Sequence, residues 1–420
     1  MPTTTTAERW ALAGWVGAAT VLELIRQVGQ ASYDVLWAED GPVFLGGALN
    51  HAFPAPVLDP YTGYVLVPSR LIAEVATVLP LNRAAIVLAA APAVLAAAVS
   101  AFVYVASGAV LRSRWSRGVL AVLVVLAPVA GPEITANDAN LHWFLDIGCF
   151  WALLVTPTGR GGRLAAVALV VAAGLSDLLT VAFVPLALAA LLRARWRLRG
   201  APVATAFLAA IVAQLALGWG SSSRGIATAG LSLDRLPRVF ADRVLASMTV
   251  GDHFLRDGHL ALGPALAWGS VLAVVVVVAA SWRWGTERDR VFVGVSLFYA
   301  VVLFAVPVHL RGAALAQVPA VGGIGTRYVY VPVVLLYGVV ILALDRVPRA
   351  WRVGAVVMAA VLALTTLSSY RVRTERSYGP SYTAALRGAR ASCRALSQRV
   401  RLDNPPVGFF AIRTTCARIR

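Results

Sequence analysis

Two adjacent carboxylates, Glu39 and Asp40, follow the first hydrophobic segment of a chain that contains few acids. They belong to the stretch WAEDG, at an expected boundary between water and lipid. A carboxylate near such a low-dielectric boundary can have a raised pKa, which suits it to take a proton from a hydroxyl group. The alternative is a helix cap, because Asp-Gly-Pro is a favourable helix start. We expect Asp40 to act directly as the base and Glu39 to support it.

A second group of polar residues lies in the stretch PEITANDANLHW, from Pro132 to Trp143. The stretch contains Glu133, Asn137, Asp138, Asn140 and His142, and such a cluster can hydrogen-bond a sugar or help to hold a cation. A polar turn closed by an interfacial tryptophan explains the same residues equally well. The chain has five scattered histidines, so the sequence predicts no metal site here. It predicts no required cofactor and leaves a divalent cation open.

A basic residue, Arg327, stands at the outer end of a late apolar segment in the stretch GTRYVYVP. Its planar guanidinium can bind a phosphate group through two donors, or it can extend to lipid headgroups. Arg311 offers the same chemistry across the same loop. Tyr328, and Tyr64 in the earlier stretch PYTGYVLVPSR, can contact a sugar, although tyrosine is also common at membrane surfaces without a ligand.

The composition indicates which class of protein positions these residues. The chain has 420 residues, 59% of them hydrophobic and 14% charged, and a mean hydropathy of +0.76. Soluble domains are about one quarter charged, so these values indicate a polytopic membrane protein. The net charge of +17 does not indicate nucleic-acid binding, because the positive-inside rule and anionic lipids account for basic residues in short loops. All 37 basic residues are arginine, which is typical of a GC-rich bacterium.

We predict an all-α fold with about eleven transmembrane helices. The predicted spans are 10–27, 84–111, 118–131, 142–157, 164–176, 178–192, 201–219, 261–282, 291–308, 328–345 and 353–369. The pair 164–176 and 178–192 can also form one tilted helix. A hairpin, however, keeps every short arginine-rich loop on one side, as the positive-inside rule requires of the cytoplasmic face. The N-terminus is then cytoplasmic and the C-terminus extracytoplasmic.

This topology divides the chain into a transmembrane domain, residues 1–369, and a small outer segment, residues 370–420. The long outer loops are expected at 28–83, 132–141, 220–260 and 309–327. Most acids lie in these loops, so we expect the active face on the outer side of the plasma membrane. The first loop contains a predicted interfacial helix, Leu66 to Leu79, with Arg70 and Glu74 four residues apart on one side. Cys393 and Cys416 in the outer segment can pair if it faces an oxidising compartment.

In this layout the chain resembles the GT-C superfamily, the multi-pass glycosyltransferases that take sugars from polyprenyl-phosphate carriers. The resemblance rests on WAEDG in a long first outer loop with an interfacial helix, on a basic residue in a late outer loop, and on an outward-facing tail. It covers most of the chain loosely. It implies that Asp40 is the catalytic base and that Arg327 binds the donor phosphate. The outer segment then corresponds to a reduced form of the soluble domain that many members carry.

The resemblance implies an inverting transfer of a hexosyl or pentosyl group from a polyprenyl-phosphate-linked sugar. The expected partners are this donor, a glycan, lipid or protein acceptor, and membrane lipids. The alternative function is a transporter or flippase of lipid-linked saccharides. That alternative predicts charged residues inside several spans, whereas the spans here are mostly Ala, Val and Leu. A non-catalytic membrane scaffold is a third possibility.

Overall fold

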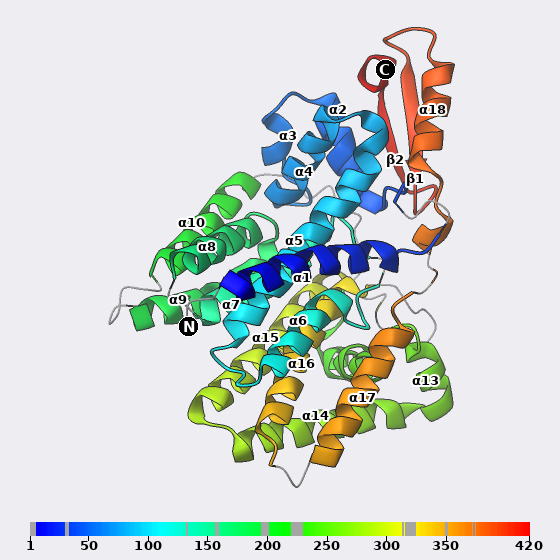
Figure 1. Cartoon of the computed structure of the whole chain (residues 1–420). Coiled ribbons are helices and arrows are strands. Elements are labelled where there is room, and N and C mark those ends of the chain that lie inside the picture. The colour runs from blue at the N-terminus through cyan, green and yellow to red at the C-terminus, as the bar shows by residue number, and fades with distance from the viewer. Residues whose placement is uncertain are drawn as a thin grey trace.

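Helices dominate the computed structural model of this chain (Figure 1). The structure describes residues 6–29, 33–131, 133–155, 159–194, 201–219, 230–312, 315, 325–348, 352–371, 373 and 375–420. Pro132 and most of the predicted outer loop 309–327 therefore lie outside the described residues, as do Arg195, Arg197, Arg199 and Arg349 of the basic loops. Within the described part of the chain, the one sheet has two antiparallel strands. The all-α class predicted from composition is confirmed.

Each of the eleven predicted segments contains a helix. These helices are α1 (Thr6–Arg26), α5 (Ala84–Ser107), α6 (Arg114–Leu126), α7 (Leu141–Leu154), α8 (Arg160–Gly174), α9 (Val184–Ala194), α10 (Ala201–Gly218), α14 (Pro264–Trp284), α15 (Glu287–Arg311), α16 (Arg327–Arg346) and α17 (Arg352–Ser368). Five helical stretches among the described residues are long and apolar enough to cross a membrane: Leu81–Ser107, Ala201–Gly218, Pro264–Trp284, Glu287–Arg311 and Arg327–Arg346. The chain therefore has the helices of a multi-pass membrane protein.

Two breaks between helices fall within or beside predicted segments. The chain breaks at Leu175–Asp177, between α8 and the 3-10 helix Leu178–Phe183, so 164–192 is not one continuous helix. The segment predicted at 261–282 begins its helix later, at Pro264. The reason is Gly263, whose φ of +54° is a backbone conformation that ends the preceding helix α13 (Leu255–Leu262).

An ion pair and main-chain hydrogen bonds join three helices at one end of the bundle. Arg346 at the end of α16 contacts Asp289 near the start of α15, with Nε 2.8 Å from Oδ2. The neighbouring Asp345 accepts hydrogen bonds from the main-chain N–H groups of Arg112 and Ser113, just before α6. The ends of α6, α15 and α16 therefore meet at this face.

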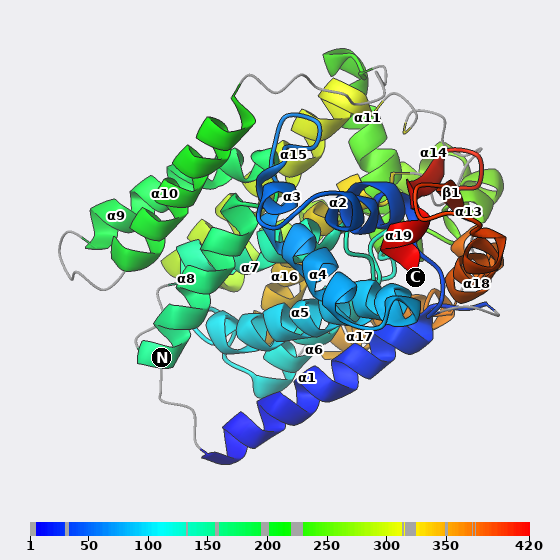
Figure 2. The ribbon, with the colours of Figure 1, turned by 90° about the horizontal axis from the view of Figure 1, so that it is seen from above.

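The opposite end carries short helices from the first predicted outer loop. They are α2 (Gly46–Asn50), α3 (Ala55–Leu58) and α4 (Val67–Val78), preceded by a 3-10 helix at Ala38–Asp40 and a π-helix at Gly41–Leu45. Seen from above, α2 and α4 lie between the group α8–α10 and the C-terminal elements (Figure 2). Two further segments, α11 (Leu236–Phe240) with the π-helix Ala241–Leu245, and α12 (Ala246–Val250), precede α13.

The helix predicted at Leu66 to Leu79 forms as α4, but its arginine does not behave as expected. Arg70 is 3% exposed and donates to the carbonyl oxygen of Val43 at 2.8 Å. Its ion-pair partner is Asp59, at 3.4 Å, rather than Glu74. Gly47 leaves room for this guanidinium, because a Cβ there would lie 2.7 Å from Nη1. Arg70 therefore anchors the first loop instead of lying on a solvated face.

The C-terminal segment, residues 370–420, folds onto this same end. It contains α18 (Tyr382–Ser392), the hairpin β1 (Arg399–Asn404) and β2 (Phe410–Thr415), and α19 (Cys416–Ile419). A disulfide joins Cys393 to Cys416, with a Cα–Cα distance of 5.8 Å. Leu402 and Ile412 of the hairpin share one hydrophobic cluster with Phe44 of the first loop. The segment is thus packed against the loop that contains WAEDG.

Candidate functional site

Asp40 ends the 3-10 helix Ala38–Asp40, where Ala38 has a φ of +46°. Its carboxylate is 1% exposed, and Oδ1 accepts a hydrogen bond from the main-chain N–H of Ala139 at 2.9 Å. The side chain makes no capping bond to the next helix. Burial raises the pKa of Asp40 to about 7, against the opposing effects of Arg376 and the Ala139 N–H. Such a carboxyl group can exchange a proton near neutral pH.

A second acid, Asp138, lies beside Asp40. It is fully buried, and neither of its carboxylate oxygens has a hydrogen-bond partner among the described residues. Burial and the nearby Asp40 raise the pKa of Asp138 well above its ordinary value. Ser69 of α4 holds the loop by donating to the Asp138 carbonyl oxygen at 2.7 Å. Two such acids side by side favour sharing one proton between them.

Glu39 faces a different set of residues from its neighbour Asp40. The Tyr61 hydroxyl donates to Glu39 Oε1 at 3.3 Å. Burial and Glu39 raise the pKa of Tyr61, whereas Arg327 and Arg311 lower it. The half-buried Arg327 is in turn attracted by Glu39. The first loop and the start of α16 therefore lie within electrostatic range of each other, with Glu39 rather than Asp40 as the WAEDG acid that acts on Arg327.

Glu133 fixes the start of α16. Its Oε2 accepts hydrogen bonds from the Thr326 hydroxyl at 3.2 Å and from the Arg327 N–H at 3.3 Å. The Arg327 guanidinium lies 5.1 Å from the ring centre of Tyr328, a favourable cation–π geometry. Glu133 also attracts Arg243, which is 2% exposed and pairs with Asp252 at 3.8 Å.

Glu133 and Arg243 differ in how far the sequence indicates them. Glu133 is one of the polar residues grouped in PEITANDANLHW, without a role of its own. Arg243 belongs to an outer loop, a place where a single arginine carries no distinguishing pattern. Glu133 is identified by its hydrogen bonds to Thr326 and Arg327, and Arg243 by its attraction to Glu133.

His142 and Asp177 form the next part of the site, with Nε2 and Oδ2 3.8 Å apart. Asp177 lies in a turn and is 8% exposed, and its Oδ1 accepts from the Leu179 N–H at 3.0 Å. Asp177 also acts on Tyr64. Burial and the negative charge of Asp177 raise the pKa of that tyrosine. Asp146, one turn beyond His142 on α7, is fully buried and interacts with Asp177. The sequence interpretation passed over Asp146 because it lies in an apolar run.

The amide residues of the same loop build the turn itself. Asn140 Oδ1 accepts from the indole N–H of Trp143 at 3.2 Å, and the Asn140 N–H donates to Asn137 Oδ1 at 3.3 Å. Trp143 is 3% exposed, so the expectation of an interfacial tryptophan is wrong. Its ring packs edge-on against Tyr328 at 5.9 Å instead. The stretch is therefore both a closed polar turn and the support of Asp138 and His142.

No family model, curated protein or solved structure matches this chain. The site must be interpreted from its own chemistry. Within the described residues, no group of three or more His, Cys, Asp or Glu side chains is arranged to hold a metal ion. What the fold brings together at one end of the bundle is two acids from WAEDG, two tyrosines, a histidine–aspartate pair and the arginine of α16.

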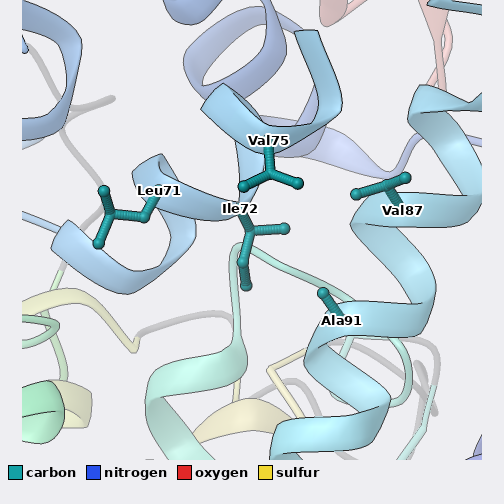
Figure 3. A pocket seen from close by; sticks show the side chains of 5 residues that line it. All are labelled: Leu71, Ile72, Val75, Val87 and Ala91. Carbon is teal, nitrogen blue, oxygen red and sulfur yellow. The ribbon is translucent and has the colours of Figure 1, made fainter. Parts of the chain in front are cut away.

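An apolar groove of about 190 Å³ lies between α4 and α5 (Figure 3). It is lined by Leu71, Ile72, Val75, Val87 and Ala91. Leu71 and Val75 are 44% and 55% exposed, so the groove has an open apolar side. The same helix contacts the Asp138 loop through Ser69, less than one turn away.

Proposed function

We propose that this protein is a membrane glycosyltransferase that moves a sugar from a polyprenyl-phosphate carrier to an acceptor hydroxyl with inversion. The observation that carries the proposal is that Glu39 of WAEDG and Arg327 at the start of α16 both act on Tyr61. Tyr61 contacts Glu39 and lies in the field of Arg327 and Arg311, so an acid and two guanidiniums from distant parts of the chain surround one position.

The proposed reaction uses the acids and the arginines at opposite ends of the transferred sugar. Asp40 takes the proton of the acceptor hydroxyl, and the oxygen attacks the anomeric carbon. The bond from that carbon to the phosphate oxygen breaks, and the phosphate leaves with an additional negative charge. Arg327, oriented by Tyr328, stabilises that charge with help from Arg311. Glu39 supports the site through Tyr61.

The proposal also assigns the membrane arrangement. We place eleven spans in the bilayer, with the WAEDG loop and residues 370–420 on the extracytoplasmic side of the plasma membrane. The disulfide Cys393–Cys416 supports this side, because disulfides persist in oxidising compartments. The carrier chain is placed in the apolar groove of α4 and α5, whose side chains offer only hydrocarbon contact.

The test is a transfer assay with the purified protein in nanodiscs, a polyprenyl-phosphate-linked sugar and a glycan extract. Asp40→Asn should lower acceptor-dependent release of polyprenyl phosphate by about a thousandfold or more, as expected for loss of a general base. Arg70→Gln, which also removes a buried charge from the first loop, serves as the comparison for structural damage. Full activity in Asp40→Asn would remove this residue from the mechanism.

A transporter of lipid-linked saccharides is the second candidate, and Asp146 is the observation that favours it. This acid lies within α7, and neither carboxylate oxygen has a hydrogen-bond partner in the described part of the chain. Buried acids inside membrane helices often mark ion or substrate pathways. A transporter requires substrate movement between leaflets without release of polyprenyl phosphate. Loss of such movement in Asp146→Asn, with no transfer by the parent protein, would favour this second function.

A further inference from the structure

The C-terminal segment carries an unusual amount of positive charge for its proposed location. Residues 370–420 contain eleven arginines and only two acids, Glu375 and Asp403. The positive-inside rule explains arginines on the cytoplasmic side of a membrane. This segment, however, contains the disulfide Cys393–Cys416, which is typical of an oxidising compartment. Its charge therefore needs a different explanation, such as an anionic partner.

A groove of about 510 Å³ lies between α18 and β1. Its α18 side contains Ala385, Gly388 and Ala389, whose small side chains leave space beside the strand. Its β1 side contains Arg399, Arg401 and Asp403. The groove thus combines a smooth helical wall with a charged strand.

The arginines of this groove project together into solvent. Along β1, Val400 and Leu402 are buried, whereas Arg399 and Arg401 alternate with them on the exposed face. The side chain of Arg399 makes no hydrogen bond or ion pair with any described residue. Arg401 pairs with Asp403 at 2.7 Å.

The register of the hairpin adds a third arginine to this face. Arg401 lies directly opposite Arg413 of β2, and both are exposed. Like charges at directly opposed positions destabilise a strand pair. An anion bound between them would remove that repulsion. The hairpin therefore has more positive charge on one face than its own single carboxylate can balance.

We propose that this groove, with the adjoining face of the hairpin, binds an anionic polysaccharide through Arg399, Arg401 and Arg413. Guanidinium groups bind carboxylate and phosphate groups through paired donors, and residues two apart on a strand are about 6.6 Å apart. Such spacing places several donors along one extended chain. The inference rests on the proposed extracytoplasmic location of the segment, together with its charge and its groove, and does not depend on the transfer reaction.

The position of the groove favours a polymer over lipid headgroups. The junction with the rest of the protein is at Asn404, which donates to the Ala38 carbonyl oxygen. Arg399 lies at the other end of β1, about 17 Å farther along the strand. Figure 1 shows α18 and the hairpin at one extremity of the molecule, far from α14 and α17.

The binding test uses the full chain in nanodiscs of zwitterionic phosphatidylcholine. The probes are fluorescent polygalacturonate, which carries carboxylates, and neutral dextran of the same length. We expect polygalacturonate to bind at least about tenfold more tightly than dextran, with an affinity that falls as salt is added. Equal binding of the two polymers, or no binding of polygalacturonate, would overturn the proposal.

Matched double variants locate the contact. The double variant Arg399→Gln/Arg401→Gln should weaken polygalacturonate binding about tenfold. The control is Arg387→Gln/Arg418→Gln, which removes the same charge from exposed positions outside the groove. This control should change the binding less than about twofold. Equal losses in the two pairs would mean that diffuse charge alone binds the polymer, and the groove would be rejected.

Asp403→Asn provides a test with the opposite sign. It frees Arg401 from its carboxylate partner, so polygalacturonate should bind about threefold more tightly. If Asp403 had only a structural role, Asp403→Asn would not increase the affinity for polygalacturonate.

A final experiment replaces the polymer with phosphatidylglycerol vesicles. If the groove variant weakens vesicle binding while polygalacturonate does not bind the parent protein, lipid headgroups are the partner and the proposal fails.

Discussion

Asn404, the last residue of β1, donates a hydrogen bond at 2.8 Å to the carbonyl oxygen of Ala38, two residues before Asp40. The Ala38 N–H donates to the Pro405 carbonyl oxygen at 2.7 Å. Both main-chain groups of an alanine with a φ of +46° are thus held by the C-terminal segment. Non-glycine residues in this region are strained, so the surrounding contacts must maintain the conformation. The segment at the end of the chain helps to shape the acidic loop near its beginning.

A steric coupling between Gly41 and Asn404 follows from this contact. A Cβ on Gly41 would lie 2.5 Å from Asn404 Oδ1. Gly41→Ala should therefore destabilise the protein by about 1–3 kcal/mol, since it displaces a buried hydrogen-bonded amide. Thermal unfolding in detergent measures the effect. Because Asn404→Ala removes the obstructing group, the double variant should lose less than the sum of the two single losses. Simple additivity would contradict the coupling.

Asp40 should make both activity and stability depend on pH, in opposite directions. As a base it must be ionised, so transfer should increase as the pH rises through about 7. Its folded pKa is raised from 3.8, so between pH 4 and pH 7 the folded protein retains a proton that the unfolded chain has lost. The contribution of Asp40 to the free energy of unfolding is therefore fully present at low pH. It decreases by up to ~4 kcal/mol as the pH rises through that interval.

Asp40→Asn separates these two effects. The variant should be inactive, yet its melting temperature should decrease less between pH 5 and pH 8 than that of the parent protein, because the amide has no charge to bury. Asp138, Glu39 and Arg376 are the charged groups that act on Asp40, and all three remain in the variant. An identical decrease in both proteins would show that Asp40 is not the titrating group.

Arg376 should set the pH at which Asp40 ionises. Its guanidinium is 3% exposed, donates to the carbonyl oxygens of Thr135 and Ala136 at 3.0 Å each, and attracts Asp40. Arg376→Gln removes a charge that lowers the pKa of Asp40, so the rise of activity should move to higher pH. Arg376→Lys should restore part of the shift. The pH–rate profile is the measurement, and a lower activity without any shift would indicate a structural role only.

The pair Arg346–Asp289 should be important for stability at the opposite end of the bundle. The two side chains are 5% and 3% exposed and 2.8 Å apart. Arg346→Met leaves a buried carboxylate without its partner and should cost about 3–5 kcal/mol. Chemical unfolding measures it, with the exposed Arg288→Gln as a control expected to change stability by less than about 0.5 kcal/mol. Adding Asp289→Asn to Arg346→Met should recover part of the loss.

The helices could be predicted because their signal is local. Long runs of apolar residues form helices in a membrane, since every main-chain polar group must be satisfied within the segment. The periodicity of 66–79 was sufficient to predict α4, which the structure places at Val67–Val78. The residues of WAEDG also stood out, because acids are rare in such a composition. These features depend on residue type and spacing along a few turns of chain.

The pairing of the site residues depends on contacts between distant segments, which spacing does not encode. Glu39 and Asp40 are adjacent in sequence but have different surroundings. Glu39 accepts a hydrogen bond from Tyr61 and attracts Arg327. Asp40 accepts a hydrogen bond from Ala139 and is influenced by Asp138 and Arg376. The resemblance to the GT-C superfamily pairs Asp40, as the base, with Arg327, as the phosphate-binding residue. The 3-10 turn at Ala38–Asp40 separates the two carboxylates, and that turn is held by the C-terminal hairpin.

Glu39 and Asp40 were therefore identifiable as unusual acids from the sequence alone, as were the helices that carry their neighbours. Only the tertiary structure decided which acid is buried, because burial is a property of all the segments packed around a residue. The same holds for Asp146 and Arg243, whose environments come from α7, α16 and the outer loops together. Local propensity determined the elements, and the long-range packing of polar groups determined the site.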